Sequence, residues 1–472
     1  MSSARTPHAL ILPYPAQGHI VPMMELSYRL IERGVRITFI NTHFNHNRIF
    51  ATKASGQATF IGEEIDGINF VAIPDGLEPE DDRHDFGGLT QSLMKVMPTL
   101  LEELIRDNGG EFTCFVADIN MAWALKIGKN LGLRTAAFWP AAAAAGLLDA
   151  IFSIPELIQN GVIDEHGALM KKEVIQLNPG ITPLDSANLP WHCFDDAYTK
   201  VIIFNYLITN NQATSNAEMM ICNSFEELEK PIFSKIPHIL PVGPLDSKFE
   251  SRDLNLCQLW PEDKQCIAWL DKQSTNSVIY VAFGSITIFN NKQFQELALG
   301  LELTGRPFLW VVRPDLTNKT VNCTFPLGFE ERVANRGRMV GWSPQHKVLK
   351  HPAIACFVSH CGWNSTIEGL RNGVPFLCFP YFCDQLFNQK YITDVWRIGL
   401  SLTRDENGLI SKEEVRSKVE ELLKDTNIIT KSLSLKQLAS SSVMEGGSSL
   451  KNLNKFAEFL RENQVKEVQK LV

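Results

Sequence analysis

The chain has 472 residues, of which 44% are hydrophobic and 21% charged, and its formal net charge is -8 at pH 7. This composition is typical of globular proteins, and the length predicts two or three domains, of which we expect two. The acidic balance, without a basic stripe, argues against nucleic acid as a partner.

The first half of the chain alternates short apolar runs with helical patterns. The expected elements are, in chain order, strand 8–14, helix 20–32, strand 35–41, strand 112–118, helix 121–132 and strand 134–139. Repeated β-α-β units of this kind predict a parallel sheet with helices on both faces.

The most apolar long stretch, residues 136–148, is rich in alanine and contains Pro140. It is shorter than the roughly 20 residues that a membrane-spanning helix needs, so we expect no membrane span. The N-terminus does not resemble a signal peptide, and the ten cysteines contain no C-x-x-C pair. These features predict a cytoplasmic protein with reduced thiols, and we expect it to be a monomer.

The second half repeats the alternation of strands and helices. The expected elements are strand 277–285, helix 293–303, strands 307–313, 337–342 and 354–360, a helix from about 365, and strand 374–380. The chain is therefore predicted to be an α/β protein with two parallel-sheet domains.

The predicted domain boundary lies where this periodicity stops, in a segment rich in proline, glycine and charge. We expect an N-terminal domain over 1–240, a linker over 241–262 and a C-terminal domain over 263–447. Residues 448–472 begin with a serine-capped amphipathic helix, which is expected to dock on the body of the protein.

Residues 342–385 concentrate the residue types that bind ligands. The strand 354–360 ends in His360, and a C-G-W turn leads into a helix expected to open at Asn364 or Ser365. A helix N-terminus at the carboxyl end of a parallel strand favours an anion, and phosphate is the anion that we expect there. An alternative interpretation is that Ser365 and Glu368 form a capping box that only closes the helix end.

The same stretch contains W-x-P-Q, H-P, F-x-x-H-C-G-W-N-S-x-x-E and D-Q in order. It closely resembles the plant secondary product glycosyltransferase signature of the plant family 1 UDP-dependent glycosyltransferases. P-x-x-x-Q-G-H at 13–19 and F-G-S at 283–285 extend the resemblance over the whole chain. The resemblance implies the GT-B fold, with two facing Rossmann-like domains, parallel sheets and a deep interdomain cleft.

The resemblance also implies a UDP-sugar site in the C-terminal domain. It assigns uracil to Trp342 and Ser343, ribose to Gln345 and Glu368, diphosphate to Ser285, His360, Asn364 and Ser365, and the sugar to Trp363, Asp384 and Gln385, with Gly362 lying in the same loop. Gln385 favours UDP-glucose, since glutamine at this position of the family usually accompanies glucose.

A base is also expected, because an acceptor hydroxyl must lose its proton to displace UDP from the sugar. His19 follows the first strand at the start of a helix, whose dipole favours the neutral imidazole, and Asp118 ends a strand of the same domain. The family's His-Asp dyad falls on these two positions. The structural alternatives are a polar residue at a helix entrance for His19 and a helix N-cap for Asp118. We expect Gly18 to permit a tight turn.

The acceptor is predicted only by class. Tyr14, Gln17, His19 and Tyr381 are the expected acceptor contacts, consistent with flavonoids, other phenolics or terpenoids. The acidic run 78–85 is expected to be solvated, with a gate over the acceptor as the alternative. Many relatives have Thr or Ser where this chain has Pro140 and Ala141, so one sugar contact is lost or supplied elsewhere.

The predicted function is therefore an inverting hexosyltransferase that uses UDP-glucose as co-substrate and has no bound cofactor. No D-x-D occurs in the sequence, so no metal requirement is expected. The nearest alternatives are a UDP-sugar epimerase or hydrolase and a non-catalytic binder on the same architecture. An acyltransferase is disfavoured, because its H-x-x-x-D motif at 192–196 has no D-F-G-W-G partner, and a dehydrogenase is disfavoured because no G-x-G-x-x-G follows a strand.

Overall fold

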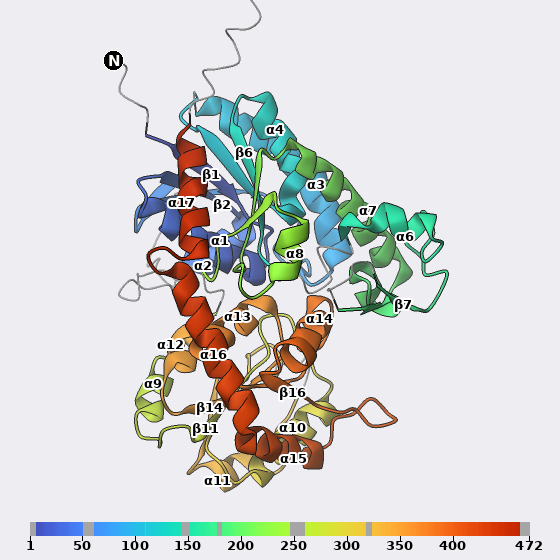
Figure 1. Cartoon of the computed structure of the whole chain (residues 1–472), viewed down its shortest axis with the longest axis vertical. Helices are drawn as coiled ribbons and strands as arrows, with labels where there is room; N and C mark the ends of the chain where they lie inside the picture. Colours follow the sequence, from blue (N-terminus) through green and yellow to red (C-terminus); the bar gives the residue numbers. More distant parts are fainter. Residues whose placement is uncertain are drawn as a thin grey trace, which may run out of the picture. The chain divides into compact units, whose positions relative to one another are not determined.

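The computed structural model describes residues 6–50, 61–108, 110–143, 151–176, 182–245, 260–317 and 323–462. The chain forms two compact units (Figure 1). The first unit comprises Met1–Leu259 with Ser442–Val472, and the second comprises Trp260–Ser441. Residues 246–259 of the expected linker lie outside the described residues, so the linker limits stay a prediction.

The first unit contains an eight-stranded sheet of order β10-β9-β6-β5-β1-β2-β4-β3. Its strands are β1 His8–Leu12, β2 Arg36–Thr42, β3 Ile61–Ile65, β4 Ile68–Ile73, β5 Cys114–Asp118, β6 Arg134–Trp139, β9 Met219–Cys222 and β10 Ile239–Pro241. All neighbouring pairs are parallel except β3 with β4. The strand order reverses between β1 and β5, and ligands of open α/β sheets collect at such a switch point.

Helices cover this sheet and connect its strands. They are α1 Gln17–Ile31, α2 His43–Phe50, α3 Phe86–Asp107, η1 Ile119–Ala124, α4 Leu125–Asn130, α6 Ile154–Gln159, η2 Ser186–Asn188, η3 Pro190–Cys193, α7 Ala197–Ala213, η4 Thr214–Asn216, α8 Lys230–Lys235 and α17 Ser448–Arg461. A short antiparallel pair, β7 Val174–Ile175 and β8 Leu184–Asp185, lies apart from the main sheet.

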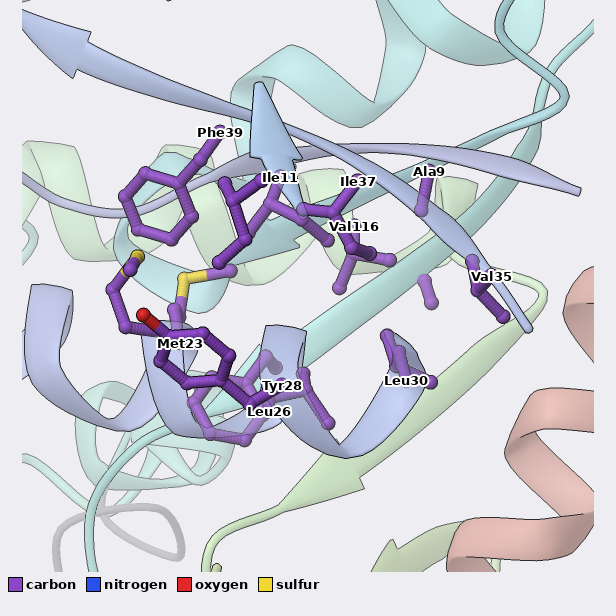
Figure 2. Packing of buried hydrophobic residues seen from close by; sticks show 14 of the residues in the cluster. Ala9, Ile11, Met23, Leu26, Tyr28, Leu30, Val35, Ile37, Phe39 and Val116 are labelled. Carbon is purple, nitrogen blue, oxygen red and sulfur yellow. The ribbon is translucent and has the colours of Figure 1, made fainter. Parts of the chain in front are cut away.

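The core of the first unit forms between the sheet and α1 (Figure 2). Met23 and Leu26 of α1 pack with Ile11 and Phe39 of the central strands. The same cluster includes Phe456 of α17, which is fully buried. The expected serine cap of this last helix is wrong, because its N-cap is Gly447 and makes no side-chain cap hydrogen bond.

The second unit contains a six-stranded sheet, parallel throughout, of order β13-β12-β11-β14-β15-β16. Its strands are β11 Val278–Ala282, β12 Phe308–Val311, β13 Gly337–Val340, β14 Ile354–Ser359, β15 Phe376–Cys378 and β16 Gly399–Ser401. The strand order is that of the dinucleotide-binding fold, and its switch point lies between β11 and β14.

The helices of the second unit complete its α/β layers. They are α9 Gln265–Leu270, α10 Asn291–Leu303, α11 Phe329–Val333, α12 Gln345–Lys350, α13 Trp363–Asn372, α14 Asp384–Lys390, the π-helical η6 Tyr391–Val395 and α15 Lys412–Lys424. The next helix, α16 Thr426–Val443, extends past Ser441, the last residue of the unit. Within the described part of the chain, no helix is both long and apolar enough to cross a membrane.

Candidate active site

His19 and Asp118 meet at the switch point of the first sheet. Helix α1 begins at Gln17, three residues earlier than predicted, so His19 lies in its first turn. The Nδ1 atom of His19 lies 2.7 Å from Oδ2 of Asp118, and the carboxylate is fully buried. The other oxygen of Asp118 accepts a hydrogen bond from the Asn120 N–H at 2.8 Å. Asp118 therefore caps η1 and binds the histidine at once, and the two interpretations of it are compatible.

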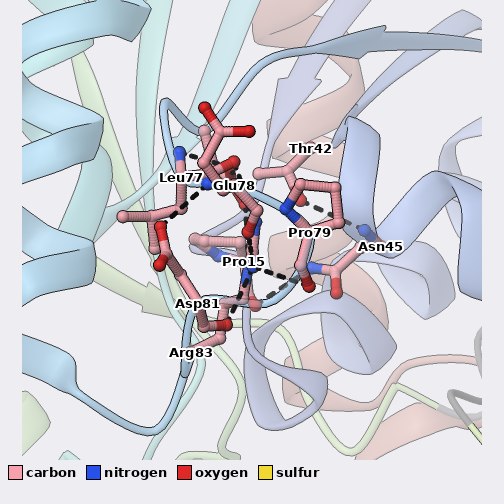
Figure 3. Close-up of polar contacts among 9 residues, drawn as sticks. Pro15, Thr42, Asn45, Leu77, Glu78, Pro79, Asp81 and Arg83 are labelled. Carbon is pink, nitrogen blue, oxygen red and sulfur yellow. Dashed lines mark hydrogen bonds and ion pairs between the residues drawn. The ribbon is translucent and has the colours of Figure 1, made fainter.

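The chain before His19 is held in place by its neighbours. Asn45 of α2 donates its side-chain amide to the Pro15 carbonyl at 3.0 Å, as Figure 3 shows. The Tyr14 ring lies 5.3 Å from the imidazole ring, and burial raises the pKa of this phenol to about 12. Tyr14 is buried, so it supports the histidine from inside the unit.

Gly18 has a different role from the one expected. It lies within α1 rather than in a tight turn, so that prediction is wrong. A Cβ placed on Gly18 would have no heavy atom within 4 Å. The backbone beside His19 therefore borders open space.

The acidic run near this site is exposed, as expected, but it is tied together by Arg83 (Figure 3). The guanidinium of Arg83 pairs with Asp75 and donates to several backbone carbonyls of the loop, those of Leu77, Glu78, Pro79 and Asp81. It also lies 4.2 Å from the Phe44 ring centre. The loop is therefore an exposed turn whose backbone is held together by hydrogen bonds to the Arg83 side chain.

Helix α13 of the second unit begins at the carboxyl edge of β14. Its first residue is Trp363 and its N-cap is Gly362, which makes no side-chain cap hydrogen bond. Ser365 is therefore inside the helix, and the capping-box interpretation is wrong. The first N–H groups of this helix retain the electropositive end that favours an anion.

Instead of capping, Ser365 and Glu368 share one partner. The Nε2 atom of Gln345 donates to Ser365 Oγ at 3.0 Å and to Glu368 Oε2 at 2.8 Å. The Tyr280 hydroxyl donates to Gln345 Oε1 at 3.1 Å and contacts Ser343 Oγ at 2.9 Å. Burial raises the pKa of the Glu368 carboxyl, while Arg371 and Gln345 oppose that rise. A continuous polar network thus joins the starts of α12 and α13.

His360 packs between two glycines. A Cβ on either Gly284 or Gly362 would lie 2.5 Å from its Nε2 atom, so both turns require glycine here. Burial, with a contribution from the charge of Arg313, lowers the pKa of His360 to about 4. Its Nδ1 atom is buried and has no hydrogen-bond partner among the described residues. The ring is therefore neutral near pH 7.

The remaining residues predicted to bind the UDP-sugar also lie at the carboxyl edge of the second sheet. Asp384 opens α14 and accepts from Asn388 Nδ2 at 2.9 Å, and the same amide nitrogen donates to the Cys361 carbonyl at 2.8 Å. Gln385 accepts the N–H groups of Tyr381 and Phe382 through its side-chain oxygen. Because these contacts use the side-chain oxygen of Gln385, its side-chain nitrogen is the group that can donate to a ligand.

The two tryptophans of the signature differ in setting. Trp342 follows β13, is partly exposed, and its carbonyl accepts from Asp263 N–H at 2.9 Å. Trp363 is buried and packs 6.3 Å from the Trp396 ring. A partly exposed indole can stack on a base, whereas a buried one offers mainly its backbone.

The structure brings the predicted residues together in two groups. Tyr14, Gln17, His19 and Asp118 lie in the first unit, and the predicted UDP-sugar residues with Tyr381 lie in the second. Sequence reasoning missed Tyr280, Asn388 and Arg313, which contact the motif residues or their turns. A tyrosine and an arginine at strand positions of a β-α-β pattern were the available signals. Among the described residues, no group of histidine, cysteine and acidic side chains has the arrangement to hold a metal ion.

Each unit thus has a doubly wound, mainly parallel topology with polar groups at its switch point, which is the arrangement of nucleotide-binding α/β proteins. The family described as "UDP-glucoronosyl and UDP-glucosyl transferase" matches residues 188–441. UDP-glycosyltransferase 83A1 of Arabidopsis thaliana is 41% identical over 96% of this chain and 97% of its own. A 7-deoxyloganetic acid glucosyltransferase of Catharanthus roseus is 34% identical over 96% and 97%.

A solved structure of Os79 from O. sativa in complex with UDP has a TM-score of 0.76 and 27% identity, and the match covers 96% of this chain and all of that one. The chain belongs to the plant UDP-glycosyltransferase family and has the GT-B fold. It is a hexosyltransferase that uses a UDP-sugar.

Proposed function

We propose that this enzyme is an inverting transferase that moves glucose from UDP-glucose to a hydroxyl of a small hydrophobic acceptor. The observation that carries the proposal is the 2.7 Å contact between His19 Nδ1 and a fully buried Asp118. This is the arrangement of a base with its orienting carboxylate.

The chemistry follows from that pair. Asp118 fixes the proton on Nδ1, so Nε2 accepts the proton of the acceptor hydroxyl. The hydroxyl oxygen then forms a bond to the anomeric carbon while the bond from that carbon to the UDP oxygen breaks. Attack opposite the leaving group inverts the anomeric configuration, and Asp118 stabilises the imidazolium that forms.

The donor is assigned to the second unit. The uracil would stack on Trp342 beside Ser343, and the ribose would bind Gln345 and Glu368, which are already aligned by their hydrogen bond. The diphosphate would lie at the start of α13, with donors from Ser285, His360, Gly362, Asn364 and Ser365. An N–H-rich helix terminus supplies positive potential without a metal. We expect full activity in EDTA, and activity that is lost with the chelator and restored by Mn²⁺ would contradict this.

The sugar is assigned to the backbone of Trp363 and the side chains of Asp384 and Gln385. Since the oxygen of Gln385 is held by its own loop, its amide nitrogen would donate to a sugar hydroxyl. The preference for glucose rests on Gln385 itself, because the family resemblance associates glutamine at this position with UDP-glucose.

The acceptor class rests on the aromatic rings of two expected contacts, Tyr14 and Tyr381, and on the relatives. One relative is named for 7-deoxyloganetic acid, and one solved structure of Os79 holds a trichothecene. We propose a flavonoid, another phenolic or a terpenoid as the acceptor. Its predicted contacts are Tyr14, Gln17 and His19 of the first unit and, as a separate prediction, Tyr381 of the second. The cytoplasmic location and the monomeric state of the enzyme stay predictions.

The test is turnover of a panel of hydroxylated phenolics and terpenoids with UDP-glucose and UDP-galactose, read by mass spectrometry. Proton NMR of the product should show a β-glucoside formed from the α-linked donor. His19→Ala should lower kcat by at least about 10³-fold, since it removes the base, while UDP binding stays unchanged. His84→Ala is the matched control, because His84 forms an exposed pair with Asp82 in the same unit.

Two outcomes would contradict the proposal. Retention of near wild-type turnover in His19→Ala would remove the base from the mechanism. Release of glucose or its epimer without any acceptor-linked product would favour a hydrolase or epimerase.

A further inference from the structure

Arg313 is a buried cation beside the residues assigned to the diphosphate. It follows β12, and only 2% of its side chain is exposed. Its guanidinium makes hydrogen bonds in two directions. Nε and Nη2 bind the two oxygens of Asp315, each at 3.0 Å. Nη1 donates to the Gly284 carbonyl at 2.8 Å, and Nη2 donates to the Thr287 carbonyl at 3.0 Å.

These two carbonyls belong to the turn that follows β11. Gly284 has a φ of 65°, a left-handed conformation that glycine adopts readily, and Ser285 comes next. Arg313 therefore binds the turn on both sides of Ser285. A guanidinium suits this role because its rigid fork binds two acceptors at a fixed separation.

The same turn also contacts His360. The Gly284 backbone lies so close to the imidazole that no Cβ fits between them. A shift of the turn would therefore move Ser285. It would also remove the packing of the Gly284 backbone against the His360 ring. Arg313 thus positions Ser285 and His360, two of the residues assigned to the diphosphate, without itself being one of those residues.

The charge of Arg313 matters as well as its shape. Its carboxylate partner, Asp315, is 27% exposed and thus partly screened by water, whereas the guanidinium is buried. Charges are screened less inside a protein than in water, so a positive potential remains at the turn. This positive potential favours binding of the negatively charged diphosphate of UDP. It does not favour uridine, which is uncharged.

We propose that Arg313 is a positioning residue for the donor diphosphate, which shapes the Gly284–Thr287 turn and supplies a fixed positive charge behind it. This inference rests on the proposed assignment of the diphosphate to Ser285 and His360. It adds a residue outside the signature that acts through the turn rather than by contact.

The experiment compares the affinities of the full-length protein for UDP and for uridine by calorimetry. The diphosphate preference is the ratio of the two dissociation constants. Arg313→Met should reduce this preference about tenfold, with uridine affinity changed less than twofold. Arg313→Lys, which keeps the charge but not the fork, should retain part of the preference. Arg306→Met is the control for loss of an arginine–carboxylate pair elsewhere in the unit, since Arg306 pairs with Glu420 at a position that is 35% exposed.

A second variant separates charge from folding. Asp315→Asn leaves an acceptor for Arg313 but removes the compensating charge at a partly exposed position. It should leave UDP affinity unchanged or raise it two- to threefold at low salt. If Asp315→Asn weakens UDP binding as much as Arg313→Met does, the pair is only a structural brace and the inference is wrong. Equal losses of UDP and uridine affinity in Arg313→Met would also overturn it.

A double variant, Ser285→Ala with His360→Gln, distinguishes this inference from its premise. If the double variant loses the diphosphate preference and Arg313→Met keeps it, only the role of Arg313 is wrong. If the double variant keeps the preference, Ser285 and His360 do not hold the diphosphate, and the inference about Arg313 is wrong together with its premise.

Discussion

Asp118 serves two hydrogen-bond donors, and its replacement by asparagine separates their consequences. Asp118→Asn keeps an acceptor for the Asn120 N–H but cannot stabilise an imidazolium at His19. We expect kcat to fall about 10³-fold, while stability changes by no more than about 1 kcal/mol, the usual scale of a capping contact. Steady-state kinetics and urea unfolding measure the two effects.

The control for this variant is a capping aspartate without a histidine. Asp185 accepts the Ala187 N–H at 2.9 Å at the start of a short helix of the same unit and is exposed. Asp185→Asn should leave kcat unchanged. If both variants lose activity alike, capping rather than proton transfer explains the effect of Asp118.

His360 should make the stability of the protein depend on pH. Its pKa is about 4 in the fold and about 6.5 when unfolded, because burial disfavours the charged ring. Between these values the unfolded chain binds a proton that the folded chain does not. Stability is therefore full above about pH 6.5 and falls as the pH drops towards 4, by up to about 3 kcal/mol.

Urea unfolding from pH 7 to 4.5 measures this loss. His360→Gln removes the titrating ring, so its stability should fall less steeply over this range than that of the wild type. Parallel curves for the two proteins would show that His360 binds its proton equally well in both states.

The sequence identifies the signature residues as a candidate site, and their ligand roles stay predictions, but their local contacts could not be predicted. Gln345 and Glu368 were assigned to the same ribose, yet nothing in the spacing showed that they bond to each other. The arginine at the end of the expected strand 307–313 was a signal, but its contact with the turn after β11 could not be predicted. The acceptors in that turn are the backbone carbonyls of Gly284 and Thr287, and backbone acceptors leave no residue pattern.

Helix α17 is far in sequence from the rest of the first unit, yet it packs into the core of that unit. Phe456 is fully buried in the cluster that includes Ile11 and Phe39. Phe456→Ala should lower the free energy of unfolding by about 3 to 5 kcal/mol through lost burial and a cavity. Urea unfolding followed by circular dichroism measures the change. Lys455→Ala, at an exposed neighbouring position, should cost less than about 0.5 kcal/mol, and equal losses would mean that the helix does not pack through this face.

The amphipathic pattern was sufficient to predict that α17 docks, since its apolar residues recur at helical spacing. Helix starts were predicted less well. Helix α1 begins at Gln17 and α13 at Trp363, each before the expected residue. In both cases the N-cap, Ala16 or Gly362, makes no side-chain cap hydrogen bond, so the usual start signal of a polar cap was missing.

At the scale of the whole molecule, both sheets reverse their strand order where the candidate groups lie, between β1 and β5 and between β11 and β14. The alternation of strands and helices predicted two such sheets, because a right-handed crossover leaves few other parallel topologies. The residues predicted to bind the UDP-sugar all belong to the second unit, whereas α17, which follows them in the chain, belongs to the first. UDP should therefore stabilise the elements of the second unit and leave those of the first unit, including α17, unchanged.

Hydrogen exchange tests this division. UDP at about 100 times its dissociation constant should stabilise the unit that binds it by about 2.7 kcal/mol, which slows exchange through its global opening about 100-fold. We expect this slowing in β11 and β14, and little change in β1, β5 or α17. Mass spectrometry of peptides from these elements, with uridine as the weaker ligand, measures it. Equal slowing in α17 and β14 would show that the two units unfold as one cooperative body, because stabilisation of one unit would then protect every amide that exchanges only through global unfolding.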